Sequence, residues 1–279
     1  MAAGDGPLLL PGCYDALGAR LIEQAGFDVV YMTGFGTAAS LLGRPDVGLL
    51  GLTEMADNAR RIVAATDLPV IADADTGYGN QINAIRTVQV YEQAGVAGIH
   101  IEDQQLPKKC GHMEGKIVVP RDEFVAKIAA AVDARQNPDF TIIARTDARA
   151  PHGLDEALDR AREAHQAGAD VLFVEALQSP EELATVAAEL KGLPLVFNWA
   201  EGGKTPPLTY DEIHELGFAM IIMPISTLLV ATRAMQQVLQ QIRNDGSPAN
   251  AVASMPAFDE FTNTIGLPEI LDLEQKFAG

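Results

Sequence analysis

One short pattern recurs along this chain and limits its fold more than any other feature. A helix-like segment ends at a glycine, and an apolar run begins a few residues later; the four glycines are Gly26, Gly95, Gly168 and Gly217. Glycine reaches the left-handed backbone conformation that ends many helices without a steric penalty. The repetition predicts a helix–turn–strand unit that is used several times in succession.

Eight apolar runs of strand length are spread along the chain, at residues 8–10, 29–33, 69–75, 98–103, 141–147, 171–175, 195–198 and 220–224. The expected helices lie between them, at 16–25, 53–65, 81–94, 121–135, 154–167, 180–190, 210–216 and 226–243, with a shorter one at 37–42. Runs that are apolar throughout are typical of parallel strands buried on both faces. We therefore predict an α/β fold, a (β/α)8 TIM-type barrel. The alternative is a doubly wound open sheet, but no Gly-x-Gly-x-x-Gly loop follows a strand.

The last part of the chain is expected to lie outside the barrel. Residues 244–250 have the composition of a linker, and the apolar residues after it are Phe258, Phe261, Ile265, Leu267, Ile270, Leu271 and Leu273. An apolar segment of this kind needs a surface to cover it. We expect a barrel over residues 1–243 and a C-terminal helical extension over 244–279, packed on the barrel or on a neighbouring subunit.

Composition excludes several classes of partner. Thirty-eight acidic residues against twenty basic ones give a formal charge of −18, which repels nucleic acid and anionic membrane surfaces. The most apolar window, residues 218–231, is interrupted by Pro224 and is too short to cross a bilayer. Two cysteines, Cys13 and Cys110, cannot form a dense disulfide framework. Because the N-terminus also lacks a basic segment followed by an apolar one, we expect a cytoplasmic protein without nucleic-acid or membrane partners.

Polar residues follow the apolar runs where a barrel enzyme carries its active site. They are Thr33, Asp73, Asp75, Glu102, Asp103, Arg145, Asp147, Glu175 and Asn198. In a (β/α)8 barrel the carboxyl ends of all strands meet on one face, and that face is the catalytic one. Some of these residues could instead cap the helices that follow.

A metal site is predicted from two pairs of residues. Asp73 and Asp75 stand two positions apart at the end of an expected strand, so both should point into the barrel mouth. Two adjacent carboxylates repel each other unless a cation lies between them, and Mg²⁺, which keeps several waters, is the simplest one. His100 and Glu102 repeat the spacing on the next strand and could join the same site. The alternative is a pair of capping aspartates and a buried histidine.

Two further residues suggest chemistry on an acid substrate. Arg145 lies at a strand end, where it could bind a substrate carboxylate with two hydrogen bonds or pair with Asp147 or Glu175. Cys110 lies among Lys108, Lys109 and His112, whose positive charges would favour the thiolate. The alternative for Cys110 is a polar surface loop that happens to contain a cysteine.

Five segments together resemble the isocitrate lyase/phosphoenolpyruvate mutase superfamily, and the similarity extends over essentially the whole chain. They are Pro11-Gly12-Cys13-Tyr14-Asp15-Ala16, Asp73-Ala74-Asp75-Thr76-Gly77, His100-Ile101-Glu102-Asp103-Gln104, Lys108-Lys109-Cys110-Gly111-His112 and Ala144-Arg145-Thr146-Asp147-Ala148. The chain resembles the short branch, which includes 2-methylisocitrate lyases, dimethylmalate lyases and carboxyphosphonoenolpyruvate phosphonomutase.

The resemblance implies roles for particular residues. Mg²⁺, with Mn²⁺ as the other candidate, would bind most directly to Asp75, while Asp73, His100 and Glu102 hold its waters. Cys110 would be the catalytic acid or base on a loop shaped by Lys108, Gly111 and His112, and Tyr31 would assist at the reacting hydroxyl. The residues implied in binding or ordering the substrate are Thr33, Gly34, Asp46, Asp73, Arg145, Glu175 and Asn198.

The implied activity is cleavage of a carbon–carbon bond. The substrate would be a 2-hydroxy dicarboxylate or tricarboxylate, of 2-methylisocitrate or 2,3-dimethylmalate type, and the products a 2-oxo acid such as pyruvate and a carboxylate. A phosphonomutase or an oxaloacetate decarboxylase of the same superfamily is the alternative, and a non-catalytic dicarboxylate-binding barrel is a remote one. The resemblance also implies helix-swapped dimers that pair into a homotetramer. A thiol that donates a proton must be protonated, whereas its cationic neighbours favour thiolate, and the sequence leaves this conflict open.

Overall fold

The four repeated glycines end helices in the computed structural model, which describes residues 6–278. Gly26, Gly95, Gly168 and Gly217 have φ values of 84°, 88°, 101° and 85°. They follow the helices α1 (Ala16–Gln24), α4 (Gln81–Ala94), α7 (Leu154–Gln166) and α9 (Tyr210–Leu216). The predicted turn therefore occurs at all four positions, and the chain passes from each helix into a strand.

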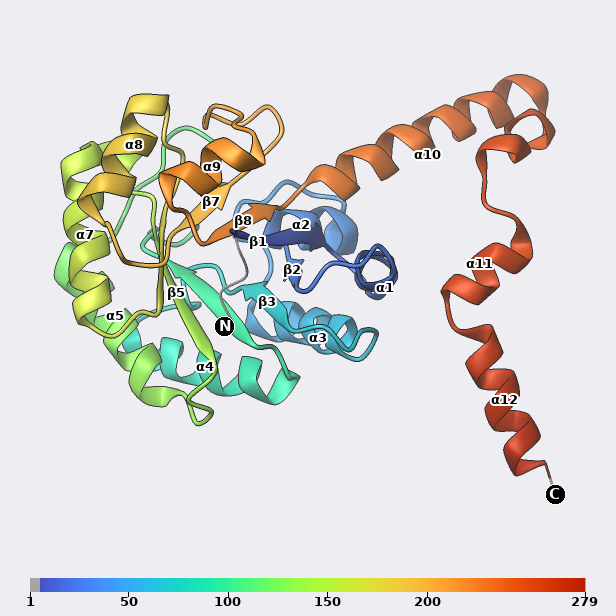
Figure 1. Cartoon of the computed structure of the whole chain (residues 1–279), viewed down its shortest axis with the longest axis horizontal. Coiled ribbons are helices and arrows are strands. Elements are labelled where there is room, and N and C mark those ends of the chain that lie inside the picture. Colours follow the sequence, from blue (N-terminus) through green and yellow to red (C-terminus); the bar gives the residue numbers. More distant parts are fainter. Residues whose placement is uncertain (1–5, 279) are drawn as a thin grey trace. The chain divides into compact units, whose positions relative to one another are not determined.

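Eight parallel strands form a nearly closed barrel (Figure 1). They are β1 (Leu8–Cys13), β2 (Val30–Met32), β3 (Val70–Asp73), β4 (Gly98–Glu102), β5 (Thr141–Thr146), β6 (Val171–Val174), β7 (Val196–Asn198) and β8 (Met220–Met223). The order of pairing is β6-β5-β4-β3-β2-β1-β8-β7. A single bridge between Leu172 and Leu195 joins the two end strands. The predicted (β/α)8 fold is confirmed.

The remaining helices of this part of the chain are α2 (Gly34–Leu42), α3 (Leu52–Val63), α5 (Arg121–Ala134), α6 (Arg149–His152) and α8 (Pro180–Glu189). Helix α2 begins three residues before its expected start because Thr33 caps it, with its side-chain oxygen accepting a hydrogen bond from the backbone of Gly36. The short helix α6 was not expected.

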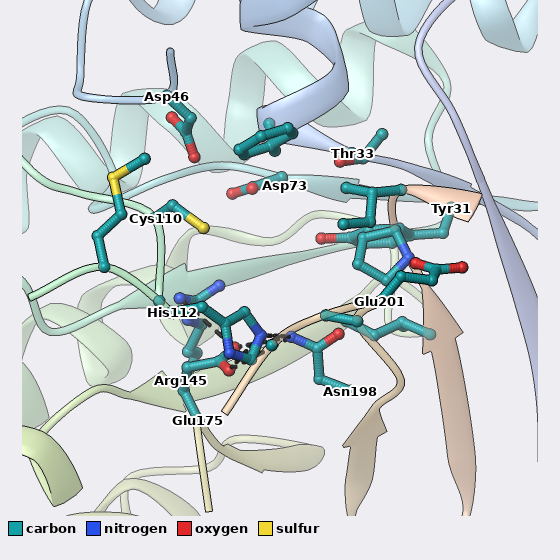
Figure 2. Close-up of a pocket in the computed structure, with 18 of the residues that line it drawn as sticks. Tyr31, Thr33, Asp46, Asp73, Cys110, His112, Arg145, Glu175, Asn198 and Glu201 are labelled. Atoms are coloured by element: carbon teal, nitrogen blue, oxygen red, sulfur yellow. Dashed lines mark hydrogen bonds and ion pairs between the residues drawn. The ribbon is translucent and has the colours of Figure 1, made fainter. Parts of the chain in front are cut away.

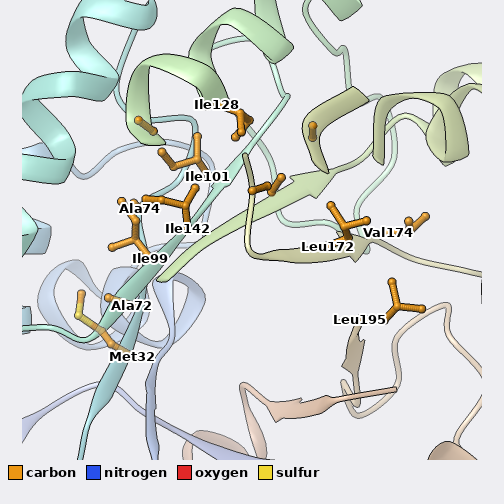
Figure 3. Close-up of a cluster of buried hydrophobic side chains, with 14 of the residues drawn as sticks. Met32, Ala72, Ala74, Ile99, Ile101, Ile128, Ile142, Leu172, Val174 and Leu195 are labelled. Atoms are coloured by element: carbon orange, nitrogen blue, oxygen red, sulfur yellow. The ribbon is translucent and has the colours of Figure 1, made fainter. Parts of the chain in front are cut away.

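Neighbouring residues of a strand pack in different parts of the core. Tyr31 and Ile143 belong to the cluster inside the barrel, whereas Met32 and Ile142 belong to the larger cluster between the sheet and the helices. Figure 3 shows part of the outer cluster, where Ile128 of α5 packs with residues of the strands. Both faces of each strand are buried, which explains why the strands are apolar throughout.

The contacts between residues divide the chain into one unit that ends at Ser226 and another that begins at Thr227. The second unit holds most of α10 (Ser226–Asp245), together with η1 (Ala249–Ser254), α11 (Phe258–Thr264) and α12 (Leu267–Phe277). Many of its apolar side chains are exposed in the single chain, including Phe258 and Phe277. The domain boundary expected at residue 243 stays a prediction, because contacts within one chain do not establish which segments fold together. Over the described part of the chain, no helix has both the length and the apolar character needed to cross a membrane.

Candidate active site

A cavity of about 230 Å³ lies at the carboxyl ends of the strands (Figure 2). Most of the predicted site residues line it, namely Tyr31, Thr33, Asp46, Asp73, Lys108, Cys110, Gly111, His112, Arg145, Glu175 and Asn198. Gly34, Asp75, His100 and Glu102 do not line the cavity. The last three are buried side chains close to residues that do line it.

Asp73 and Asp75 are brought together by a turn and not, as predicted, by their positions on one strand. Asp73 is the last residue of β3, but Asp75 lies beyond the strand and has a φ of 47°. A turn therefore brings them together, with the backbone N–H of Asp75 donating to Oδ1 of Asp73 at 2.9 Å. The expectation that strand alternation orients both carboxylates was wrong, because the strand ends too early. A left-handed conformation at a non-glycine residue is strained, and such strain often marks a functional site.

His100 and Glu102 keep the spacing expected of one strand, and the sheet places them opposite Asp73 and Arg145 respectively. His100 Nε2 lies 2.7 Å from the Tyr31 hydroxyl and 3.5 Å from Asp73 Oδ1. Burial lowers the pKa of His100 to about 4 and raises the pKa of Tyr31 well above its usual value. Both groups are therefore neutral at physiological pH.

The buried carboxylates suit a hard divalent cation. Oε1 of Glu102 is buried and has no hydrogen-bond partner within residues 6–278. Burial raises the pKa of Asp75 to about 7 and that of Glu102 well above its usual value, and the nearby charge of Asp73 adds to both shifts. Among the described residues, no three His, Cys, Asp or Glu side chains are arranged to enclose a metal by themselves. Mg²⁺ binds one or two carboxylates and keeps several waters, and the buried carboxylates of Asp73, Asp75 and Glu102 offer oxygen ligands of this kind.

Carboxylates hold the Arg145 guanidinium in place on the opposite side of the cavity. Its Nε and Nη2 atoms lie 3.0 and 3.2 Å from Asp147, and they also lie within 3.5 Å of Glu102 and Glu175. Both ion pairs considered from the sequence, with Asp147 and with Glu175, are present. These charges raise the pKa of Arg145 well above its usual value. The Nη1 atom makes no hydrogen bond within the described residues, so it is available to a ligand.

Two buried lysines fasten the loop that carries Cys110. Lys108 Nζ lies 2.7 Å from Asp46 Oδ1 and 2.6 Å from Asp75 Oδ1. Lys116 Nζ lies 2.9 Å from Asp147 Oδ1 and donates to the Gly111 carbonyl. Sequence reasoning gave Lys116 no structural role, since nothing in the sequence separates a buried lysine in a loop from a solvated one.

Two glycines of the site are required by close packing. A Cβ atom at Gly34 would lie 2.3 Å from Asp73 Oδ2, and one at Gly111 would lie 2.5 Å from Arg145 Nη2. Distances this short are repulsive. Without a Cβ atom, Gly34 lets the backbone approach the Asp73 carboxylate, and Gly111 lets it approach the Arg145 guanidinium. Neither residue offers a side chain to a substrate.

The structure resolves the conflict over the Cys110 thiol. Burial, with a smaller effect of Asp46, raises the pKa of Cys110 to about 11. Lys108 is bound to carboxylates, and Lys109 Nζ donates to the carbonyl oxygens of Glu114 and Gly115. The expected lowering of the thiol pKa by these cations was therefore wrong. Cys110 is protonated at neutral pH, and its sulfur points into the cavity (Figure 2).

His112 and Asn198 meet at Glu175. His112 Nδ1 accepts a hydrogen bond from the backbone of Lys204, so in the neutral ring the proton is on Nε2, 3.4 Å from Glu175 Oε1. Asn198 Nδ2 donates to Glu175 Oε2 at 3.0 Å. Oδ1 of Asn198 is buried and has no partner among the described residues. This oxygen can accept a hydrogen bond from a ligand.

The segment after β7 closes one side of the cavity, and the sequence analysis missed it. Ala200, Glu201, Gly202 and Gly203 line the cavity there. Trp199 donates from Nε1 to the Leu208 carbonyl at 3.0 Å and so ties the two ends of this segment together. A Glu-Gly-Gly sequence beginning three residues after a strand end was the signal that could have revealed it.

Known proteins are similar to this chain in sequence over most of its length. The family model described as phosphoenolpyruvate phosphomutase matches residues 1–243. The 2,3-dimethylmalate lyase of Eubacterium barkeri is 48% identical over 97% of this chain and 93% of its own length. The 2-methylisocitrate lyase of Halalkalibacterium halodurans is 42% identical over 97% of this chain and 89% of its own length.

Three solved structures have the same fold. A crystal structure of 2,3-dimethylmalate lyase has a TM-score of 0.93 and 42% identity, covering 99% of this chain and 92% of that one. Oxaloacetate acetylhydrolase in complex with 3,3-difluorooxalacetate has a TM-score of 0.93 and 39% identity, covering 99% and 94%. Phosphonopyruvate hydrolase in complex with oxalate and Mg²⁺ has a TM-score of 0.89 and 31% identity, covering 99% and 95%.

Proposed function

The chain belongs to the phosphoenolpyruvate phosphomutase/isocitrate lyase superfamily, and from this premise we propose that it is a carbon–carbon lyase. Its substrate is a 2-hydroxy dicarboxylate or tricarboxylate of 2,3-dimethylmalate or 2-methylisocitrate type, and its products are a 2-oxo acid such as pyruvate and a second carboxylate. The observation that carries this proposal is the protonated Cys110 thiol, which faces the cavity that Arg145 also lines. A proton donor and a carboxylate-binding cation are two of the groups that such a cleavage needs.

In the proposed reaction Arg145 and Asn198 hold the substrate carboxylates, and the neutral Tyr31 hydroxyl lies near the reacting 2-hydroxyl. The proton of the 2-hydroxyl passes to the Tyr31 oxygen as the Tyr31 proton moves to His100 Nε2, 2.7 Å away, and the 2-oxo group forms while the bond between C2 and C3 breaks. The electron pair of that bond stays on C3, next to a carboxylate, and Cys110 delivers its proton there. Burial keeps the thiol protonated in the resting enzyme, so the proton is present when the negative charge forms on C3.

We assign the metal site to the buried carboxylates of Asp73, Asp75 and Glu102, at the edge of the cavity. Asp75 would bind Mg²⁺ or Mn²⁺ directly, and Asp73, His100 and Glu102 would hold its waters. The bound ion would stabilise the negative charge that develops on the substrate oxygen. The unpartnered Glu102 oxygen and the raised pKa of Asp75 support this assignment.

The test is a comparison of substrates under Mg²⁺. Release of a 2-oxo acid would be followed for 2,3-dimethylmalate, 2-methylisocitrate, oxaloacetate and phosphonopyruvate, with Cys110→Ser as the control enzyme. We expect pyruvate from one of the first two and little turnover of the others. Turnover of oxaloacetate or phosphonopyruvate alone would contradict the lyase assignment. A complete lack of turnover would favour a non-catalytic dicarboxylate-binding barrel.

We further propose that the protein works in the cytoplasm as a homotetramer of two helix-swapped dimers. Cys13 and Cys110 are free thiols, which a reducing compartment preserves. The exposed apolar side chains of the second unit support the assembly, since a partner subunit would cover them.

A further inference from the structure

The turn that carries Asp75 is bound through every one of its carbonyl groups. Five consecutive carbonyl oxygens, from Asp73 to Gly77, each accept a hydrogen bond. Two of the donors are the backbone N–H groups of Gly77 and Glu102, which bind the carbonyls of Ala74 and Asp75. The other three donors are side chains of the helices α4 and α5. Residues 73–77 are buried, and a buried carbonyl left without a hydrogen bond costs free energy, so the turn depends on each of these donors.

Lys127 of α5 is the charged donor among these five, and it is buried. Its side chain is 1% exposed, and Nζ donates to the Thr76 carbonyl at 2.9 Å. Within residues 6–278 this lysine forms no ion pair and no other hydrogen bond. Glu123, Asp103 and Glu102 attract this ammonium group from beyond ion-pair distance, but burial outweighs them and lowers its pKa. We therefore look for a role of the buried Lys127 ammonium group other than stabilising the fold.

Tyr91 of α4 supports the same turn from the other end. Its hydroxyl donates to the Asp73 carbonyl at 2.9 Å and accepts from the hydroxyl of Tyr78, 3.0 Å away. Asp75 and Tyr78 both have left-handed backbone conformations, with φ values of 47° and 58°. Non-glycine residues keep such conformations only when their surroundings hold them there. Lys127 and Tyr91 bind carbonyls on either side of Asp75 and supply that constraint.

Lys127 reaches the turn from outside the reaction cavity. Thr76 and Lys127 line a separate cavity of about 310 Å³, and neither residue lines the one that holds Cys110 and Arg145. A change at Lys127 would therefore not alter a direct contact with substrate. It would act through the backbone of Asp75, and so through the orientation of the carboxylate assigned to the metal.

We propose that Lys127 and Tyr91 are positioning residues for the divalent metal, which hold Asp75 in its left-handed conformation through the carbonyl groups of Thr76 and Asp73. This inference rests on the metal site of the proposed function. Groups that orient metal ligands are worth about 10–100-fold in metal affinity. Without either donor, Asp75 can relax toward an ordinary conformation and its carboxylate moves away from the site.

The experiment measures binding of Mn²⁺ to the substrate-free full-length enzyme, with free Mn²⁺ followed by electron paramagnetic resonance. Lys127→Met and Tyr91→Phe keep the shape of each side chain and remove the hydrogen bond. We expect each variant to bind Mn²⁺ about tenfold more weakly than wild type, and excess Mn²⁺ to restore turnover. Arg135→Met is the matched control, because Arg135 also binds a backbone carbonyl, that of Phe140, but lies in the segment just before β5, away from the Asp75 turn.

The outcomes separate the two proposals. Wild-type affinity in the folded variants, or an equal loss in Arg135→Met, would overturn the positioning role and leave the metal site intact. A wild-type enzyme that binds no Mn²⁺ would overturn the metal assignment and the positioning role with it. If Lys127→Met does not fold, Tyr91→Phe decides, since it removes a single oxygen atom.

Discussion

At the scale of single residues, the environment of Cys110 decides what its thiol can do. The neighbouring lysines in the sequence would favour a thiolate, and the sequence left the protonation state open, but their ammonium groups bind Asp46, Asp75 and backbone carbonyls. Burial then dominates and raises the pKa of the thiol to about 11. A thiol of this kind donates a proton better than it attacks a substrate.

Cys110→Ser should lower turnover by about 10²–10⁴-fold, the usual contribution of general acid–base catalysis. Substrate affinity should change little, because Arg145 and the metal do the binding. Steady-state kinetics would measure both effects, and cleavage in D₂O should place one deuteron stereospecifically on the released carboxylate. Stereospecific labelling at a near-normal rate in the variant would show that another residue is the acid.

Alkylation of Cys110 by iodoacetamide should become faster with pH across the whole range from 7 to 10. Because the pKa of the thiol is raised to about 11, the thiolate fraction rises about tenfold per pH unit until that pKa is approached. Mass spectrometry of the modified peptide would measure the rate, with Cys110→Ser as the control for Cys13. A rate that levels off near pH 8 would mean that the cations, and not burial, control the thiol.

At the scale of elements, the strand ends supply part of the site, and two loops supply the rest. The loop with Cys110 is anchored by Lys108 and Lys116, and the segment after β7 is tied by Trp199 and joined to His112 through Lys204. Apart from the Trp199 hydrogen bond within its own segment, these anchors are polar contacts between segments far apart in the sequence. They keep the thiol and the guanidinium at a fixed separation, which a short flexible loop would not do.

Gly111→Ala should reduce turnover by about 10²-fold with little loss of thermal stability. The added Cβ would lie 2.5 Å from Arg145 Nη2, so the loop must shift away from the cavity, and a displacement of about 1 Å can cost this much. Gly51→Ala is the control, because its Cβ would meet no atom closer than 3.8 Å. Kinetics and thermal unfolding of both variants would test this, and unchanged turnover in Gly111→Ala would contradict the tight approach.

At the scale of the whole molecule, the described part of the chain contains a nearly closed barrel and a second unit with little core of its own. The second unit exposes Phe258, Ile270 and Phe277, among other apolar residues. Large exposed apolar side chains on successive helices are typical of surfaces that another chain covers. This favours the proposed assembly over a monomer.

The protein should behave as a homotetramer of 29.7 kDa subunits in multi-angle light scattering at micromolar concentration. Ile270→Asp with Phe258→Asp should lower the molar mass, because charges in a buried apolar interface are unfavourable. Glu274→Gln, a polar change on the same helix as Ile270, is the control and should leave the mass unchanged. An active wild-type monomer would refute the assembly.

The sequence by itself determined the barrel and the identity of most residues around the cavity. The glycines after the helices, the continuous apolar runs and the polar strand ends are local patterns, and neighbouring residues largely decide such structure. Only the tertiary structure decided the protonation of Cys110, the turn that orients Asp75, and the roles of Lys116, Lys127 and Trp199. Each of these depends on burial or on contacts that tertiary folding creates, because solvent exclusion and charge act through space and not along the sequence.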